Sequence, residues 1–370
     1  MNDIISKRLE GIRHYLKEKG LDCLLVSQAD NRRYLSGFAG SAGALLISIQ
    51  RAVLATDFRY IEQAKIQAPQ FEVVQIKGEI ANWLPGLASS QNIFSLGFEA
   101  EDLSYAAYTQ LADVVSKSPS LRLVPTQGIV VEIRAKKDSR EMHLIREAVA
   151  LAEEAFIHLP KFLRPGLSEK AVAWELEKFL REKGSESMPF DIIVASGANA
   201  ALPHHHPSER LIQAGEPIIV DLGAKIDGYA SDLTRTFCLG APDDTYRKVY
   251  GIVLQSQQNA IDKVQSGMTG SQADALSRSI IEEAGYGNAF GHGLGHGIGA
   301  AVHEEPRLGP GTLAPLQSEM AFTIEPGIYL PGWGGVRIED DIYLTPQSAQ
   351  LMSQRSRNLF AGIEKSIVRL

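Results

Sequence analysis

Residues 290–306, FGHGLGHGIGAAVHEEP, place three histidines in a stretch rich in glycine. His292, His296 and His303 are four and seven residues apart, which would put them on one face of a helix. The glycines between them disfavour a helix, because glycine loses the most conformational entropy when its backbone is fixed. The stretch therefore predicts a non-helical backbone that approaches a bound group closely and presents imidazole nitrogens to it, as in a metal site.

Two aspartates in residues 217–239, PIIVDLGAKIDGYASDLTRTFCL, are spaced to join such a site. The segment predicts a β-hairpin with Asp227-Gly228 as a two-residue type I′ turn. This register sets Asp221 opposite Thr234, so Asp221 and Asp232 share a face as diagonal neighbours. Two carboxylates this close on apolar strands repel each other unless a cation lies between them. The alternative, two solvated acids at a hairpin edge, is less favoured because aspartate is depleted in strands.

Further acids follow later in the chain. Glu325 ends the apolar run MAFTIEPG, and strand alternation in GGVRIEDDIYL puts Arg337 and Glu339 on one face. With His296, the set comprises one imidazole and four carboxylates from separate strand-like segments. An oxygen-rich set with one histidine suits Mn²⁺, Co²⁺ or Fe²⁺, with Zn²⁺ as an alternative. Four carboxylates exceed the need of one ion, which indicates two metals that share bridging acids.

The elements that must position these residues fall into two parts. An amphipathic helix over 3–19 is followed by the apolar runs LDCLLVS, AGALLISI, RAVLATD and FEVVQI, which predict a small α/β domain over residues 1–128. The second domain, 129–370, begins with a helix over about 139–160. Glycines then bracket two helices of equal length, 166–184 and 267–285, each followed by strand-like segments. This repeat predicts a pseudo-symmetric α+β domain with a site between its halves.

Composition excludes several classes of partner. The chain has 370 residues, 44% hydrophobic content and a net charge of −7, which argues against a nucleic-acid groove or an anionic membrane partner. No apolar stretch approaches the ~20 residues that cross a bilayer, and the N-terminus lacks the apolar core of a signal peptide. Cys23 and Cys238 lie in apolar runs and are expected to be buried thiols of a cytoplasmic protein.

The acids and the imidazole in this order resemble the ligand set of the pita-bread metallopeptidases, which include Xaa-Pro aminopeptidases, prolidases and methionine aminopeptidases. The resemblance rests on the stretches VDLG, SDLTRTF, GHGLGHGIG, VHEEP, TIEPGIY and VRIEDDI. The stretches NRRYLSGFAGSAGALL and TDFRYIEQA resemble the creatinase-type N-terminal domain, which accompanies the proline-directed branch of this family. The resemblance implies a pita-bread C-terminal domain preceded by a creatinase-type domain, and a homodimer.

The resemblance also implies a role for each site residue. One metal would be held by Asp221 and the other by His296 and Glu325, and Asp232 and Glu339 would bridge both. His204, in LPHHHP, matches a substrate-contacting histidine, and His292 and His303 match the two histidines that bind no metal. Tyr329 and Arg337 would orient the acids, and Glu325 would also shuttle a proton. The neighbours of His204, His205 and His206, are expected to be exposed loop residues.

The predicted function is a metal-dependent exopeptidase that releases the residue before proline, with two divalent ions, Mn²⁺ first and Co²⁺, Zn²⁺ or Fe²⁺ as alternatives. An Xaa-Pro aminopeptidase is the first hypothesis, and an Xaa-Pro dipeptidase (prolidase) is its alternative. A dipeptidase must also bind the free carboxylate of its substrate, and the sequence does not identify the basic residue that does so. A metal-free creatinase-like hydrolase or a non-catalytic binding protein is less favoured, because all five ligands are present. The glycine-rich residues 31–43 are expected to form part of the substrate rim.

Overall fold

The computed structural model describes residues 2–117 and 121–353, which divide into two compact units. The units are Met1–Arg134 and Ala135–Leu370. The sequence places the domain boundary after residue 128, whereas this division falls after Arg134. The difference arises at helix α6 (Ile129–Ala135), because Ile129 and Val130 are buried in the core of the N-terminal unit.

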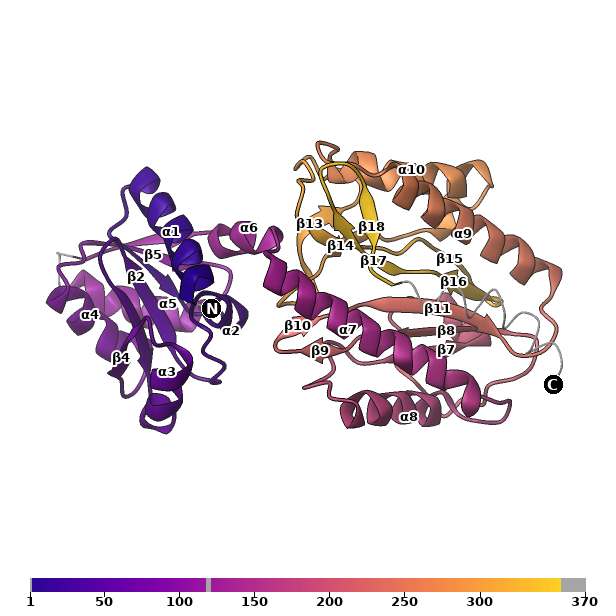
Figure 1. The fold of residues 1–370 in the computed structure, drawn as a ribbon, viewed down its shortest axis with the longest axis horizontal. Helices are drawn as coiled ribbons and strands as arrows, with labels where there is room; N and C mark the ends of the chain where they lie inside the picture. The colour runs from indigo at the N-terminus through magenta and orange to yellow at the C-terminus, as the bar shows by residue number, and fades with distance from the viewer. Residues whose placement is uncertain (1, 118–120, 354–370) are drawn as a thin grey trace. The chain divides into compact units, whose positions relative to one another are not determined.

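The N-terminal unit is built on a six-stranded mixed sheet in the order β4-β3-β2-β1-β5-β6 (Figure 1). Strand β1 pairs antiparallel with β2 and parallel with β5. The strands are β1 (Cys23–Val26), β2 (Ala44–Ser48), β3 (Ala52–Thr56), β4 (Glu72–Gln75), β5 (Ser95–Glu99) and β6 (Arg122–Thr126). The other helices are α1 (Asn2–Lys19), α2 (Ala29–Ser36), η1 (Phe58–Tyr60), α3 (Ile61–Gln67), α4 (Ile80–Ser90) and α5 (Tyr105–Ser116).

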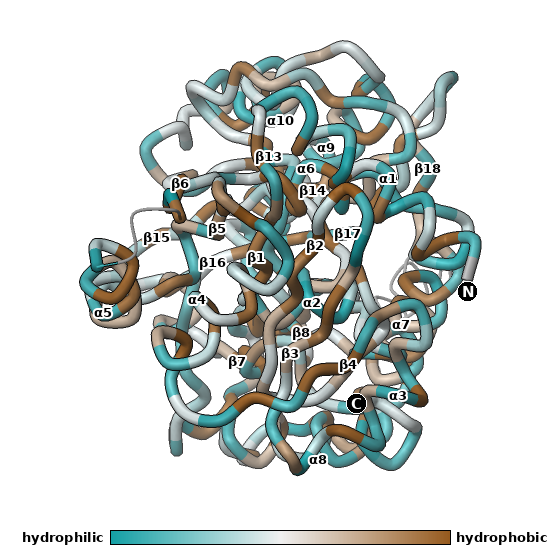
Figure 2. The backbone as a smooth tube through the Cα atoms, turned by 90° about the vertical axis from the view of Figure 1, so that its left-hand side faces the viewer, coloured by the Kyte–Doolittle hydropathy of each residue, from teal (hydrophilic) through white to brown (hydrophobic). Residues whose placement is uncertain are grey.

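Helices cover both faces of this sheet, because its strands are apolar on both sides. Leu24 and Val26 of β1 pack in a core with α1, whereas Cys23 and Leu25 pack in a second core with α4 and α5. This split follows from the two-residue period of a strand. Figure 2 shows β1 and β2 coloured as hydrophobic, in accord with strands buried on both faces. The strands predicted from the four apolar runs are confirmed.

The C-terminal unit repeats one plan twice. Helices α7 (Ser139–His158) and α8 (Glu169–Glu182) precede the three-stranded sheet β11-β8-β7, and α9 (Asp244–Lys263) and α10 (Gly270–Glu283) precede the five-stranded sheet β13-β12-β14-β17-β18. In Figure 1, α9 and α10 lie on one side of the strands and α8 on the other. The short helices are η2 (Leu159–Lys161), η3 (Gly197–Ala201) and η4 (Gly287–Ala289).

The repeat extends to local detail. Helices α8 and α10 have 14 residues each, and both begin with a hydroxyl N-cap, Ser168 and Thr269. Each N-cap residue also forms an isolated β-bridge, Ser168 with Leu211 and Thr269 with Pro315. The predicted α+β pita-bread architecture is confirmed.

The described part of the C-terminal unit contains twelve strands. They are β7 (Ile193–Ser196), β8 (Pro217–Leu222), β9 (Lys225–Ile226), β10 (Tyr229–Ala230), β11 (Leu233–Cys238), β12 (Gly295–Gly297), β13 (Glu304–Leu308), β14 (Ala321–Ile324), β15 (Gly327–Leu330), β16 (Gly334–Arg337), β17 (Asp340–Leu344) and β18 (Ala349–Leu351), within the described residues. None of the described helices combines the length and apolarity that crossing a bilayer would take.

The hairpin has the predicted register. Asp227 and Gly228 both have positive φ, 44° and 86°, as a type I′ turn requires, and Thr234 pairs with Asp221. A Cβ atom on Gly223 would lie 2.1 Å from the carbonyl oxygen of Ser231, so only glycine fits beside Asp232. The turn therefore brings Asp221 and Asp232 to one face, as predicted.

Candidate metal centre and active site

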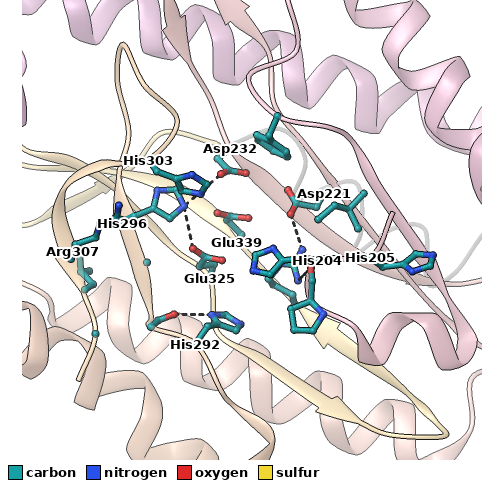
Figure 3. A pocket seen from close by; sticks show the side chains of 18 of the residues that line it. His204, His205, Asp221, Asp232, His292, His296, His303, Arg307, Glu325 and Glu339 are labelled. Carbon is teal, nitrogen blue, oxygen red and sulfur yellow. Dashed lines mark hydrogen bonds and ion pairs between the residues drawn. The ribbon is translucent and has the colours of Figure 1, made fainter. Parts of the chain in front are cut away.

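The five predicted ligands come from five places in the C-terminal unit and meet at one cavity of about 670 Å³ (Figure 3). Asp221 lies on β8 and His296 on β12, whereas the other three lie next to strand ends. Asp232 directly precedes β11, Glu325 directly follows β14, and Glu339 lies between β16 and β17. Glu325 is partly exposed and the other four are buried. The glycine-rich stretch is extended or irregular here rather than helical, as predicted.

The ligand atoms of these side chains form two overlapping groups. In one group, atoms of Asp221, Asp232 and Glu339 lie within 4.8 Å of one another, and in the other, atoms of His296, Glu325 and Glu339 do. His296 Nε2 lies 3.3 Å from Glu325 Oε1 and 3.7 Å from Asp232 Oδ2. Because Glu339 belongs to both groups, the arrangement can hold two cations that share a carboxylate.

Buried carboxylate oxygens without partners test whether a metal fits. Asp221 Oδ1, Asp232 Oδ1 and Glu339 Oε1 are buried and accept no hydrogen bond from any described residue. The second oxygen of two of these groups is satisfied, since Arg337 Nη2 donates to Asp221 Oδ2 (2.7 Å) and Thr234 Oγ1 donates to Glu339 Oε2 (2.6 Å). A buried acceptor without a partner is costly. The residues present therefore fit divalent cations, which would bind these oxygens.

The pKa shifts of the site residues indicate the same demand for positive charge. Burial, then the nearby carboxylates of Glu339 and Asp221, raise the pKa of Asp232 well above its usual range. Burial, then Glu325 and Asp221, do the same to the pKa of Glu339. Burial lowers the pKa of His296 to about 3, so its ring is a neutral ligand at pH 7. Divalent cations would displace the protons that these carboxyls otherwise retain.

A hydrogen-bonded chain connects the acids to His292. Arg337 Nη1 donates to the hydroxyl of Tyr329 (3.0 Å), and that hydroxyl lies 2.9 Å from His292 Nε2. His292 Nδ1 lies 2.8 Å from the carbonyl oxygen of Gly293, so Nδ1 carries the hydrogen and Nε2 accepts from Tyr329. Burial lowers the pKa of His292 to about 4, so this ring is neutral. Arg337 thus contacts one of the acids that it was predicted to orient, Asp221, whereas Tyr329 contacts Arg337 and His292.

The other two predicted histidines, His204 and His303, are exposed and line the same cavity. The rings of His296 and His303 lie edge to face with centroids 4.3 Å apart. Partial desolvation of the ring against the cavity wall, then the charge of Arg307, lower the pKa of His303. The structure therefore brings every predicted site residue to one cavity or to its immediate support.

Several contributors were missed or misjudged from the sequence. His205 was expected to be exposed, but its side chain is only 12% exposed and lies 2.8 Å from the buried Glu169. Cys238 is half-buried rather than buried, whereas Cys23 is buried as predicted. Arg307 lines the cavity and was not singled out, although it lies only four residues after His303. GGVRIEDDIYL is not one strand, because the chain leaves β16 before Glu339 and enters β17 after it.

The two acids after Glu339, Asp340 and Asp341, bind residues of the strands and helix that surround the site. Asp340 pairs with Arg235 (2.6 Å) and accepts from Gln257 (2.9 Å). Asp341 Oδ2 accepts from the backbone nitrogen of Asp232 (3.0 Å), which fixes the start of β11. In the sequence, the acids of VRIEDDI beside its apolar residues could have indicated that Asp340 and Asp341 are buried. Strand alternation, however, does not identify the residues that these two acids bind.

Comparison with known proteins agrees with this geometry. Residues 143–346 match the model of metallopeptidase family M24, and residues 8–136 match the creatinase/prolidase N-terminal domain. The chain belongs to metallopeptidase family M24. As a member of this family, it is a metal-dependent hydrolase.

Relatives of this M24 peptidase cover almost its entire length. An uncharacterized peptidase, YqhT of Bacillus subtilis, is 41% identical over 95% of this chain and 99% of the relative. Among solved structures, an Xaa-Pro dipeptidase from Bacillus anthracis is 42% identical, with a TM-score of 0.91 over 95% of this chain and 98% of that chain. An X-Pro aminopeptidase from Thermotoga maritima is 35% identical, with a TM-score of 0.85 over 94% and 97%. The relatives thus include both dipeptidases and aminopeptidases.

Proposed function

We propose that this M24 peptidase is a two-metal exopeptidase that hydrolyses the bond between an N-terminal residue and proline. The observation that carries the proposal is the set of three buried carboxylate oxygens without partners on Asp221, Asp232 and Glu339, beside His296 and Glu325. In this proposal Asp221, Asp232, His296, Glu325 and Glu339 would together hold the two ions. We expect Mn²⁺, with Co²⁺, Zn²⁺ or Fe²⁺ as alternatives, because the set is rich in oxygen.

When bound, the two cations would acidify a water molecule and polarise the scissile carbonyl. The chain's own residues supply the remaining chemistry. Glu325, whose carboxyl lies 3.3 Å from His296 Nε2 and accepts from Thr323 Oγ1 at 3.2 Å, takes a proton from the attacking water and transfers it to the leaving nitrogen of proline. His204 and His303, exposed on the cavity wall, donate hydrogen bonds to the carbonyl oxygen of the substrate.

Preference for proline follows from the leaving group and from the relatives. The nitrogen of an Xaa-Pro bond carries no hydrogen, so a peptidase that depends on an amide N–H donor cannot bind it. The two solved structures named above are those of an Xaa-Pro dipeptidase and an X-Pro aminopeptidase, which supports the same choice here.

Arg307 favours a dipeptidase as the form of this activity, although the sequence alone placed an aminopeptidase first. Its side chain is exposed and lines the cavity next to Leu308, Gly309 and Pro310. A dipeptide carries its free carboxylate one residue beyond the scissile bond, and a guanidinium binds a carboxylate with two hydrogen bonds. An aminopeptidase needs no such cation, because the chain of its substrate continues.

A panel of Ala-Pro, Ala-Pro-Ala and Ala-Ala-Ala on the Mn²⁺-loaded protein tests the proposal. Cleavage of Ala-Pro alone supports the dipeptidase, and cleavage of Ala-Pro-Ala supports the aminopeptidase. Hydrolysis of Ala-Ala-Ala alone, or of no peptide, would contradict proline direction. Metal content, measured by mass spectrometry after removal of excess Mn²⁺, should approach two ions per chain.

A further inference from the structure

A buried carboxylate outside the metal centre, Glu169, organises the loop that carries His204. Glu169 is the first residue of α8 and is fully buried. Its Oε1 accepts from the backbone nitrogen and the hydroxyl of Ser196, both at 2.8 Å, and from Asn199 Nδ2 at 3.1 Å. These contacts satisfy one side of the carboxylate with residues of β7 and η3.

The other oxygen of Glu169 faces the loop of residues 202–210. Ser208 donates to Oε2 from its hydroxyl (2.6 Å) and its backbone nitrogen (3.1 Å), and His205 Nε2 lies 2.8 Å from the same atom. Burial opposes ionisation of Glu169, but the hydrogen bonds from Ser208, His205 and Ser196 outweigh it and lower its pKa. The group is therefore a carboxylate, and His205 Nε2 must carry the hydrogen that it donates.

His204 lies between two anchored neighbours. On one side, Arg337 Nη1 donates to the carbonyl oxygen of Pro203 (3.3 Å), and on the other, the ring of His205 binds Glu169. The ring of His204 makes no hydrogen bond with any described residue, so its position depends on the backbone that these two anchors hold. In Figure 3, His204 points toward the acids and His205 points away from them.

We propose that Glu169 and His205 are positioning residues that fix His204 at the cavity wall. The inference rests on the proposed function, in which His204 contacts the substrate. The carboxylate of Glu169 connects α8 and β7 to the loop, and the ring of His205 transmits that constraint to its neighbour. A buried, fully hydrogen-bonded carboxylate holds a loop more firmly than exposed contacts do, and a small displacement of a catalytic side chain costs a large factor in rate.

Two substitutions of His205 separate positioning from general stability. His205→Gln keeps an amide donor near the place of Nε2, whereas His205→Phe keeps the volume of the ring and removes the donor. We expect His205→Phe to lower kcat on Ala-Pro by about 10–100-fold with KM changed by less than about threefold. His205→Gln should restore kcat to within about threefold of the parent. Equal kcat values for the parent and His205→Phe would overturn the inference.

A double-substitution cycle tests whether His205 acts through His204. His204→Ala should lower kcat on its own, and the double variant His204→Ala/His205→Phe should lose no more than about a further twofold. Additive losses would mean that His205 acts by another route and would contradict the proposal. His143→Phe, at an exposed position on α7, is the matched control for the addition of a phenyl ring, and it should leave kcat unchanged.

A readout without metal or turnover separates this inference from the proposed function. In the metal-free protein with isotope-labelled histidines, the His204 ring resonance should shift in His205→Phe and stay near its parental value in His205→Gln. Should the parent cleave no Xaa-Pro peptide, the proposed function fails while this spectrum still decides the positioning. Unmoved His204 resonances in His205→Phe would refute the positioning. If His205→Phe does not fold, His205→Asn, which is too short to reach Glu169, replaces it.

Discussion

Arg337 Nη2 donates to Asp221 Oδ2 over 2.7 Å, although the two residues are 116 positions apart in the chain. Both side chains are buried. The guanidinium occupies one oxygen of the carboxylate and leaves Oδ1 without a partner at the cavity. Arg337 also contacts Tyr329, Thr234 and the carbonyl oxygen of Pro203, so a single cation connects the acids, His292 and the His204 loop.

Replacement of this cation should therefore cost both stability and activity. We expect Arg337→Met to lower the free energy of unfolding of the metal-free protein by about 3–5 kcal/mol, because it leaves Asp221 buried without its counter-charge. Urea denaturation measures the change. Arg181→Met, which removes an exposed pair with Glu177, is the matched control and should cost less than about 0.5 kcal/mol. Equal losses in the two variants would show that the Asp221 contact adds nothing.

Mn²⁺ should stabilise the parent and not a variant that lacks the shared carboxylate. Glu339→Gln keeps an oxygen for the Thr234 hydroxyl and resembles the protonated carboxyl of the metal-free protein, so the metal-free variant should be about as stable as the metal-free parent. The parent should gain about 2.7 kcal/mol at a Mn²⁺ concentration about 100 times the dissociation constant, and the variant should gain much less. Thermal unfolding with and without Mn²⁺ measures both effects. If Mn²⁺ stabilises the variant as strongly as the parent, Glu339 is not a metal ligand.

Stability of the metal-free protein should fall as pH rises. Burial and the charge of Asp221 raise the pKa of Glu325 from 4.5 to about 8, although the charge of Arg337 partly offsets them. Between these values the native state holds a proton that the unfolded chain has released, so deprotonation favours unfolding. Urea denaturation at pH 5 and pH 8 with a chelator should show a loss on the order of a few kcal/mol at the higher pH. Glu325→Gln should flatten this dependence, and an unchanged slope in that variant would assign it to other groups.

The two thiols should resist modification to different degrees. Burial, then Asp22, raise the pKa of Cys23 to about 12, and burial, then Asp243, raise the pKa of the half-buried Cys238 to about 11. Because the thiolate is the reactive form, neither should react fast at pH 8 in the native state. We expect slow modification of Cys238 by a thiol reagent and modification of Cys23 only on unfolding, as peptide mapping would show. Faster reaction of Cys23 would contradict its place in the core.

Arg307 should affect dipeptide binding more than turnover. If it binds the substrate carboxylate, Arg307→Met raises KM for Ala-Pro about 10–100-fold, the loss expected for a charge-assisted hydrogen bond, and changes kcat little. The amide of the same dipeptide, Ala-Pro-NH₂, is the matched control and should be cleaved equally by the parent and the variant. Equal losses on both substrates would assign Arg307 to another role.

The homodimer, the cytoplasmic location and the substrate rim at residues 31–43 stay predictions.

The sequence by itself determined the features that depend on local rules. The Asp227-Gly228 turn sets the hairpin register, and the two-residue period of strands then puts Asp221 and Asp232 on one face. The glycines around His296 disfavour a helix there, and the apolar run before Glu325 forms a strand that ends at Ile324. Turn geometry and strand alternation depend on only a few neighbouring residues, so these features can be predicted from the sequence alone.

Tertiary structure alone decided which distant groups meet. Adjacent histidines of one loop have different partners, because His205 finds Glu169 across 36 residues while His204 faces the cavity. The pairing of Arg337 with Asp221, and the oxygens left without partners on the predicted ligands Asp221, Asp232 and Glu339, likewise depend on how the sheets pack. Such contacts are set by the packing of whole elements and by the requirement that buried polar groups be satisfied, and neither is encoded in the spacing of neighbouring residues.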